Sequence, residues 1–136
     1  MKKNELRALL LEQRMSFSPE DVHACTAAIA GQFIKGSFTS VQCLLSYFPL
    51  TERNEPEVRA CEEHMRALNA SMILAMPRID IPQIAMNACS IDDATVYTKN
   101  KYGIAEPANG AIVDPADIEM IFVPLIGFDT MGNRVG

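Results

Sequence analysis

The sequence predicts an α/β fold in one domain. In the first half, apolar runs of strand length alternate with segments whose apolar residues recur every three or four positions, which is typical of parallel βαβ units. The second half has few helical patterns, which favours loops or antiparallel edge strands there. A chain of 136 residues can bury a core of its own, and no linker or internal repeat divides it.

The first predicted element is an amphipathic helix over residues 4–13, because leucines recur on one side of it and charged residues on the other. Lys3, Arg7 and Arg14 point to the same side of this helix. Cations at this spacing usually form a solvated helix face. Their functional interpretation is a site for an anionic ligand.

A second helix is predicted to begin at Ser18, whose hydroxyl can cap it while Asp21 completes a capping box. Pro19 suits the first helical turn, and Gly36 ends the helix. The side that we expect to be buried consists of Val22, Cys25, Ile29 and Phe33.

One further helix and several strands are predicted in the rest of the chain. In order, they are a strand over residues 41–48, a loop over 50–55, a helix over 56–69, and strands over 71–76, 84–88, 95–97 and 117–123. Pro49 and Pro77 are expected to end the first two strands. The helix is expected to bury Val58, Cys61, Met65 and Leu68.

Composition excludes several classes of function. The apolar content of 49% is too high for a disordered chain, and no apolar run reaches the ~20 residues of a membrane helix. A formal charge of −5 argues against binding to nucleic acid. The cysteines form no CxxC pair and no zinc site, so we expect buried thiols. No export signal is visible, and we expect a cytoplasmic monomer that binds small molecules.

The closing segment, residues 121–136, carries the strongest site signal. An apolar run leads into a turn with Gly132 and Asn133, and one arginine, Arg134, follows. Glycine lets a phosphate approach the backbone and arginine supplies planar, bidentate donors, although an ordinary hairpin turn has a similar composition. Asp129 is expected to bond to the backbone of this turn. Open α/β folds bind ligands at such loops, which follow the carboxyl ends of strands.

Three segments together resemble the 5-formyltetrahydrofolate cyclo-ligase family. The closing segment is similar to the family's apolar-Pro-x-x-x-Phe-Asp-x-x-Gly-x-Arg-x-Gly signature, residues 3–7 to its KxxxR element, and residues 44–52 to its first strand and following loop. The resemblance implies a three-layer α/β fold with a mixed, largely parallel sheet flanked by helices, as in CoA-transferases and sugar-phosphate isomerases. It also implies ATP-dependent cyclisation of 5-formyltetrahydrofolate to 5,10-methenyltetrahydrofolate, with release of ADP and phosphate.

The same resemblance implies which residues bind. Those implied for ATP are Lys3, Asn4, Glu5, Leu6, Arg7, Arg134, Val135 and Gly136, and those implied for the folate are Arg7, Leu45, Tyr47 and Glu52. Arg134 would be catalytic, by stabilising charge on the transferring phosphoryl group. Glu52 would accept hydrogen bonds from the amino-pyrimidine edge of the pterin, although residues 53–56 depart from the family pattern.

In the family, this arginine is followed by a Tyr-Tyr-Asp element whose aspartate helps to hold Mg²⁺, and the sequence contains no counterpart. We therefore expect residues 1–136 to form one domain that lacks the family's C-terminal part, with ATP and Mg²⁺ as cofactors and no metal ligand of its own. Two alternatives stay open. One is a shortened relative that binds folate or nucleotide without turnover. The other is an enzyme of the isomerase or CoA-transferase kind, which needs Glu52 or Glu106 isolated in an apolar cleft.

Overall fold

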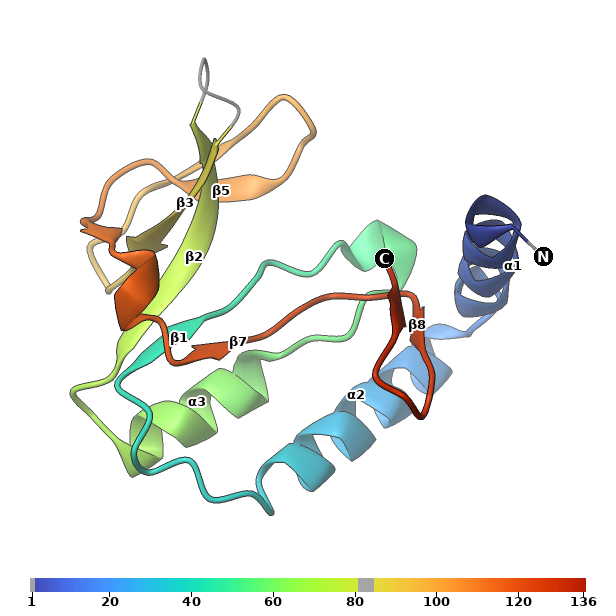
Figure 1. Ribbon diagram of the computed structural model, residues 1–136, viewed down its shortest axis with the longest axis horizontal. Coiled ribbons are helices and arrows are strands. Elements are labelled where there is room, and N and C mark those ends of the chain that lie inside the picture. Colours follow the sequence, from blue (N-terminus) through green and yellow to red (C-terminus); the bar gives the residue numbers. More distant parts are fainter. Residues whose placement is uncertain (1, 81–84) are drawn as a thin grey trace.

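The computed structural model describes residues 2–80 and 85–136, and Figure 1 shows their arrangement. The helices are α1 (Lys3–Met15), α2 (Pro19–Phe33) and α3 (Arg59–Leu68), with short 3-10 helices η1 (Thr51–Arg53) and η2 (Pro115–Asp117). The strands are β1 (Cys43–Leu45), β2 (Ile73–Asp80), β3 (Ala85–Ser90), β4 (Tyr97–Lys99), β5 (Ala105–Pro107), β6 (Ile112–Val113), β7 (Met120–Ile121), β8 (Gly127–Phe128) and β9 (Arg134–Val135).

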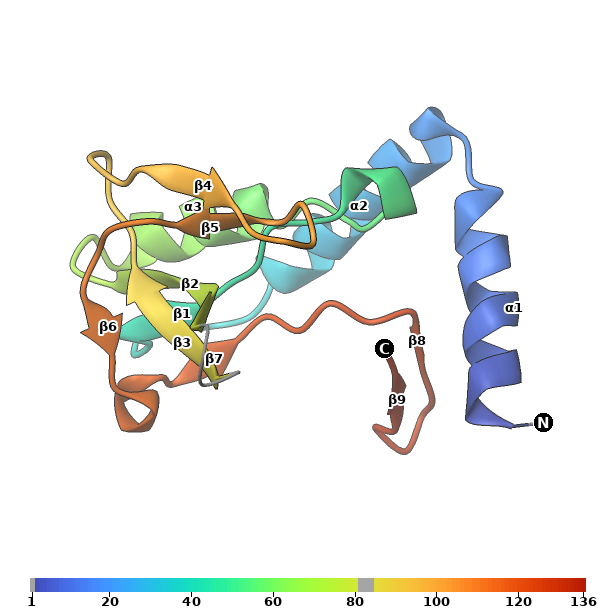
Figure 2. The ribbon, with the colours of Figure 1, turned by 90° about the horizontal axis from the view of Figure 1, so that it is seen from above.

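The main sheet has the strand order β6-β3-β2-β1-β7. β1 pairs in parallel with β2 on one side and with β7 on the other, whereas β3 pairs antiparallel with both β2 and β6. Within the described part of this sheet, β3 alone therefore runs against the other strands. Helices α2 and α3 lie on one face of the sheet (Figure 2). The predicted fold class, α/β with a mixed, largely parallel sheet flanked by helices, is confirmed.

Two strands are shorter than predicted. The strand expected over residues 41–48 is limited to β1, although the amide of Ser46 still donates to the carbonyl oxygen of Ala75 at 2.9 Å. The strand expected over residues 117–123 is limited to β7. It starts late because η2 occupies the preceding residues, where the carboxylate of Asp114 accepts a hydrogen bond from the backbone and caps that turn.

Strand β2 is longer than predicted, because it continues through Pro77 to Asp80. Pro77 lies opposite Ala88 in the antiparallel ladder with β3, and past Ala75 no described strand pairs with the other edge of β2. The missing N–H of the proline therefore interrupts no ladder on that edge. β3 corresponds to the strand predicted over residues 84–88, of which Ile84 lies outside the described residues.

A separate hairpin of β4 and β5 packs beside β2. The prediction of a strand over residues 95–97 places β4 slightly early, and it misses β5 altogether. β5 contains glutamate and proline, which are both uncommon in strands, so nothing in its composition indicates one. The turn between the two strands is fixed by Asn100, whose Oδ1 accepts hydrogen bonds from the amides of Tyr102 at 2.8 Å and Ile104 at 3.1 Å.

Helix α2 begins as the sequence predicts. Ser18 Oγ accepts from the amide of Asp21 at 3.1 Å, and Asp21 Oδ2 accepts from the amide of Ser18 at 3.0 Å, which confirms the capping box. Helix α1 extends beyond the predicted residues 4–13 at both ends.

The predicted buried side of α2 is wrong, because no residue of this helix is buried and Ile29 is 46% exposed. Only its last turn reaches the core, where the ring of Phe33 stacks on Phe38 with centroids 4.6 Å apart and meets Phe122 edge-on at 5.2 Å. The earlier turns lie towards α1, beyond the end of the sheet (Figure 1), so they have little to pack against.

The core consists of two clusters on opposite faces of the sheet. The cluster beside α3 contains Val41, Leu44, Met65, Met72 and Leu74, and the second contains Cys43, Ala75, Ala88 and Val113. Cys61 and Met65 of α3 are buried as predicted, whereas Leu68 at its end is 39% exposed. The helix begins at Arg59, three residues later than its predicted start at residue 56.

The cysteines do not share one environment. Cys43, Cys61 and Cys89 are buried free thiols as predicted, and burial raises the pKa of each. Cys25 is exposed, because it lies on the uncovered part of α2, so the prediction is wrong for this residue. None of the helices within residues 2–80 and 85–136 is long and apolar enough to span a bilayer.

Candidate functional site

The candidate site lies at the carboxyl edge of the parallel strands. β1 and β7 are adjacent and parallel, so their carboxyl ends reach the same edge of the sheet. β1 leads into residues 46–55, and β7 leads into residues 122–136, which include the β8–β9 hairpin. Helix α1 stands next to both segments (Figures 1 and 2).

Within the loop of residues 46–55, two glutamates have different surroundings. Glu55 turns back into the loop, where its Oε2 accepts from the amide of Leu50 at 2.9 Å and its Oε1 lies 3.9 Å from Arg14 Nη2. Glu52 lies in η1 and is exposed. Of the two carboxylates, Glu52 is therefore the one that is accessible to a ligand.

The structure does not bring Leu45 and Tyr47 into one cavity. Leu45 is half-buried and packs against the second core cluster, on the face of the sheet away from α3. Tyr47 is buried on the α3 side, where it lines a cavity of about 480 Å³ together with Val58, and its hydroxyl donates to the carbonyl oxygen of Pro56 at 3.1 Å. Burial, and to a lesser extent the charge of Glu55, raises the pKa of Tyr47 to about 12. Their joint contact with one pterin stays a prediction.

The first turns of α1 meet the end of β9. Arg7 Nε donates to the backbone oxygen of Gly136 at 2.8 Å, and Arg7 Nη2 donates to the same atom. Arg7 Nη1 also donates to Asn4 Oδ1 at 3.3 Å, and Glu5 Oε2 accepts from the amide of Lys2 at 2.9 Å. The segment resembling the KxxxR element thus lies against the segment that carries the second arginine.

The β8–β9 hairpin is held by its own turn. Asp129 accepts from the amides of Met131 and Asn133, both at 2.9 Å, and from Asn133 Nδ2 at 2.8 Å, which confirms its predicted role in the turn. These hydrogen bonds, with that of the Asn133 side chain foremost, lower the pKa of Asp129. Gly132 has a φ of 82°, a conformation that glycine adopts without strain.

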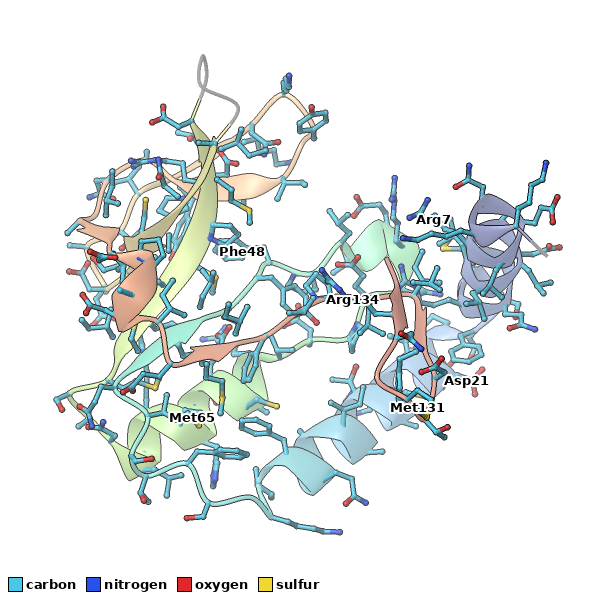
Figure 3. The ribbon with its side chains drawn as sticks, in the orientation of Figure 1. Arg7, Asp21, Phe48, Met65, Met131 and Arg134 are labelled. Carbon is cyan, nitrogen blue, oxygen red and sulfur yellow. The ribbon has the colours of Figure 1, made fainter. Side chains whose placement is uncertain are left out.

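Arg134 is exposed, and it extends from the hairpin on the side of the β1 loop (Figure 3). Together with Val135 and Phe128 it lines a cavity of about 350 Å³, which Leu6 and Leu10 of α1 close from the other side. Arg134 and Arg7 therefore come from two elements that contact each other, although they are 127 positions apart in the sequence. Lys3, the first residue of α1, is exposed at the start of the same helix.

Arg14 is not free for an anionic ligand, in contrast to the expectation that it shares a cationic face with Lys3 and Arg7. Its side chain is only 13% exposed. It pairs with Glu55, and its Nη1 donates to the carbonyl oxygen of Leu125 at 3.3 Å. Arg14 therefore joins α1, the β1 loop and the segment after β7.

Asn54 is a structural residue that the sequence analysis missed. Its Nδ2 donates to the carbonyl oxygens of Arg14 at 3.0 Å and Phe17 at 3.3 Å, at the C-terminal end of α1. Its φ is 52°, a left-handed conformation that asparagine tolerates better than most residues. An asparagine directly after Thr-Glu-Arg, at the end of a short turn, is the signal that predicts this conformation.

Glu106 does not occupy an apolar cleft. It is 8% exposed, and its Oε1 accepts from the amide of Ile79 at 2.9 Å and from Asn100 Nδ2 at 2.8 Å. Arg78 and Lys101 line the same cavity. The arrangement that would indicate a lone general base of the isomerase or CoA-transferase kind is therefore not found at this residue.

The described residues offer no cage for a metal ion. Within residues 2–80 and 85–136, no three histidine, cysteine, aspartate or glutamate side chains gather closely enough to hold one. The carboxylate nearest Arg134 in the hairpin, Asp129, already accepts three hydrogen bonds from its own turn. No residue of this part of the chain is therefore assigned to Mg²⁺.

Comparison with known proteins gives one family. The sequence model of the 5-formyltetrahydrofolate cyclo-ligase family matches residues 1–136. No curated protein sequence matches the chain.

Two solved structures are similar over the whole chain. The NMR structure of 5,10-methenyltetrahydrofolate synthetase from Aquifex aeolicus has a TM-score of 0.81 at 23% identity, and the chain covers 67% of it. The 5,10-methenyltetrahydrofolate synthetase from Mycoplasma pneumoniae has a TM-score of 0.75 at 19% identity, and the chain covers 71% of it. At these identities the likeness shows the fold, and the chain spans about two thirds of each relative's length.

Proposed function

Because the chain belongs to the 5-formyltetrahydrofolate cyclo-ligase family, we propose that it binds ATP and 5-formyltetrahydrofolate and converts them to 5,10-methenyltetrahydrofolate, ADP and phosphate. The observation that carries this proposal is the contact of Arg7 with the backbone of Gly136. It joins the opening helix to the closing hairpin, and these are the two segments whose sequences suggest phosphate binding. A ligand that lies between them can be contacted by side chains of both segments.

The proposed chemistry proceeds in two displacements. The formyl oxygen attacks the γ-phosphorus of ATP and ADP leaves with the bonding electron pair, so that a poor leaving oxygen becomes part of a phosphate ester. The neighbouring ring-substituent nitrogen then attacks the formyl carbon and loses its proton to solvent, the five-membered ring closes, and phosphate leaves with the electron pair of the broken C–O bond. Negative charge spreads over the transferring group, and Lys3, Arg7 and Arg134 are the cations that we assign to stabilise it. No side chain is needed as a nucleophile.

The pterin is assigned to the loop that follows β1. Glu52 is exposed there, and its carboxylate suits the donor-rich amino-pyrimidine edge of the pterin. Leu45 and Tyr47 are assigned to orient the ring system, with Arg7 close to both substrates. Their contribution is proximity and orientation rather than proton transfer.

Magnesium is implied by the family, and when bound it neutralises charge on the phosphates of ATP. No described side chain is assigned to the metal, and none of the steps assigned to this chain runs through it. Arg134 and the two cations of α1 are the groups that we assign to the triphosphate.

Arg134→Ala tests the assignment directly. Charge-assisted hydrogen bonds contribute about 1.5–3 kcal/mol each, so ATP affinity is expected to fall roughly 10- to 100-fold by isothermal titration. Lys35→Ala is the control, because Lys35 is an exposed cation just after α2 that lies outside the candidate site and donates to Gln32 Oε1 at 3.2 Å. An unchanged ATP affinity in the Arg134 variant would refute its role as a phosphate ligand.

Turnover is measured separately from binding, by the near-ultraviolet absorbance of the methenyl product. Product formation in the wild-type chain supports the full proposal. Binding of ATP and folate without product would show that the chain is a non-catalytic relative. Glu52→Gln is expected to lower folate affinity and leave ATP affinity unchanged, and the opposite pattern would contradict the assignment of the pterin to this loop.

A further inference from the structure

A cavity of about 400 Å³ opens at the carboxyl end of β2, beside β5 and the turn that joins β4 to β5. Its polar lining consists of Arg78, Asp80, Asn100, Lys101, Tyr102 and Glu106. Because β2 is adjacent and parallel to β1, this cavity lies at the same edge of the sheet as the loop of residues 46–55 (Figure 1). Its described lining includes none of the residues assigned above to ATP or the pterin.

The two oxygens of the Glu106 carboxylate in this cavity have different hydrogen bonds within the described residues. Glu106 is more than nine-tenths buried, and both of its hydrogen bonds, from Ile79 N and Asn100 Nδ2, go to the same oxygen, Oε1. Among residues 2–80 and 85–136, no donor pairs with its other oxygen, Oε2. Within the described residues, Oε2 is therefore the oxygen of this carboxylate that can accept a hydrogen bond from an N–H group of a ligand in the cavity.

The orientation of Glu106 is fixed before any ligand arrives. Asn100 donates to Glu106 through Nδ2 while its Oδ1 accepts from the amides of Tyr102 and Ile104. Gly103, with a φ of 75°, lets the chain turn sharply between these two amides. The turn therefore holds the carboxylate and the neighbouring Lys101 and Tyr102 in one arrangement.

Two cations accompany this carboxylate. Arg78 is half-buried at the end of β2, and Lys101 is exposed on the turn, with its Nζ 5.0 Å from the centroid of the Tyr102 ring. Within the described residues neither cation forms an ion pair. Asp80, the other acid of the cavity, accepts from Asn87 Nδ2 at 3.3 Å. The lining thus offers one acceptor for an N–H group and two cations for carboxylates.

We propose that this cavity binds the glutamyl tail of the reduced folate, an inference that rests on the proposed function. The amide N–H of the tail donates to Glu106 Oε2, and its carboxylates pair with Arg78 and Lys101. The exposed ring of Tyr102, 64% accessible, lies beside the benzoyl group. A ligand with an amide N–H next to carboxylates complements this lining, which offers one acceptor and two cations.

The order of the strands places the proposed tail site next to the pterin loop. β2, β1 and β7 are neighbours and run in parallel, so their carboxyl ends lie at one edge of the sheet in that order. The cavity is at the end of β2, the pterin loop follows β1, and the hairpin with Arg134 follows β7. The tail therefore leaves the pterin on the side away from the triphosphate.

Two ligands test the proposal: 5-formyltetrahydrofolate and its analogue 5-formyltetrahydropteroate, which lacks the glutamate. By isothermal titration, the wild-type chain is expected to bind the folate at least tenfold more tightly than the pteroate. Lys101→Met and Arg78→Met are each expected to reduce that ratio severalfold, by weakening the folate and leaving the pteroate unchanged. Lys99→Met is the control, because Lys99 is an exposed lysine of β4 that is outside the described lining.

The two titrations separate failure of the tail site from failure of the proposed function. Equal affinities of the wild-type chain for the two ligands would refute the tail site and leave the function standing. Binding of neither ligand would refute the function and the tail site with it. A ratio that stays unchanged in both the Lys101 and the Arg78 variants would also overturn the proposal.

Discussion

Asn54 allows a quantitative test of how α1 is held against the loop of residues 46–55. Asn54→Gly removes the hydrogen bonds to the carbonyl oxygens of Arg14 and Phe17 while keeping a residue that tolerates the φ of 52°. A net hydrogen bond contributes about 0.5–1.5 kcal/mol, and the bond to Phe17 is exposed and contributes at the low end. We therefore expect the free energy of unfolding to fall by about 1–2 kcal/mol.

The assay is urea denaturation followed by circular dichroism, with Asn54→Ala as the second variant. Alanine loses the same hydrogen bonds and also disfavours the left-handed backbone, by roughly 1–2 kcal/mol, part of which is offset by the lower entropy of its unfolded chain. The alanine variant is therefore expected to be the less stable of the two. A glycine variant as stable as the wild type would refute the assigned contribution of these hydrogen bonds.

Hydrogen exchange locates the effect of the same substitution. Because Asn54 bonds to the last carbonyls of α1, exchange in the glycine variant is expected to accelerate in α1 and in η1 before it does in β1 and β2. Uniform acceleration over the whole chain would contradict a local role for Asn54.

Three further substitutions test the stability of the folded chain. Burial raises the pKa of Glu62 above its ordinary value of 4.5, although the hydrogen bond from Ser46 opposes the shift, so the stabilisation from this group is fully present below that value and is lost as pH rises through the folded-state pKa. Glu62→Gln can still accept from Ser46, and in thermal melts from pH 4 to 7 it is expected to lose less stability than the wild type. Identical pH profiles of the two proteins would contradict this. Gly110→Ala is expected to lower the free energy of unfolding, measured in urea, by more than ~2 kcal/mol, because φ is 107° and a Cβ would lie 2.3 Å from the carbonyl oxygen of Ser90. Gly103 also has a positive φ but has open space around it, so Gly103→Ala is expected to lose only ~1–2 kcal/mol. Equal losses in the two variants would contradict the role of the contact with Ser90.

Local signals in the sequence predict the local parts of this structure. The capping box of Ser18 and Asp21 and the turn of Asp129 involve residues a few positions apart, so their chemistry can be inferred without the fold. The alternation of strands and helices likewise predicts the α/β class. The family resemblance also places the opening helix and the closing hairpin in one site, and these do contact each other through Arg7.

Features that depend on distant contacts could not be inferred in this way. Arg14 looks like a member of a cationic helix face, but its pairing with Glu55 and Leu125 depends on how three segments meet. The exposure of Ile29 has the same origin, because apolar spacing indicates an amphipathic helix and not how much of it the sheet covers. β5 was unpredictable for a related reason, since its pairing with β4 overrides a composition unfavourable to strands.

The position of the candidate site between α1 and the hairpin has an energetic consequence. No residue of α1 is buried, and a helix of 13 residues is marginal by itself, so its place depends on a few contacts with the rest of the chain. Those contacts are made by Arg7 at one end, by Leu6 and Leu10 in the middle, and by Arg14 at the other end.

A ligand that engages Arg7 and Arg134 together binds only the docked arrangement of these two elements. By linkage, binding then stabilises that arrangement by RT ln(1 + [L]/Kd), and each contact that favours docking strengthens binding in turn. The hydrogen bonds of Asn54 and the ion pair of Arg14 therefore act on ligand affinity although neither residue needs to touch the ligand. Because these residues hold α1 from its far end, they separate the positioning of the helix from the proposed binding of phosphate by Lys3 and Arg134, whereas Arg7 already donates to the backbone oxygen of Gly136.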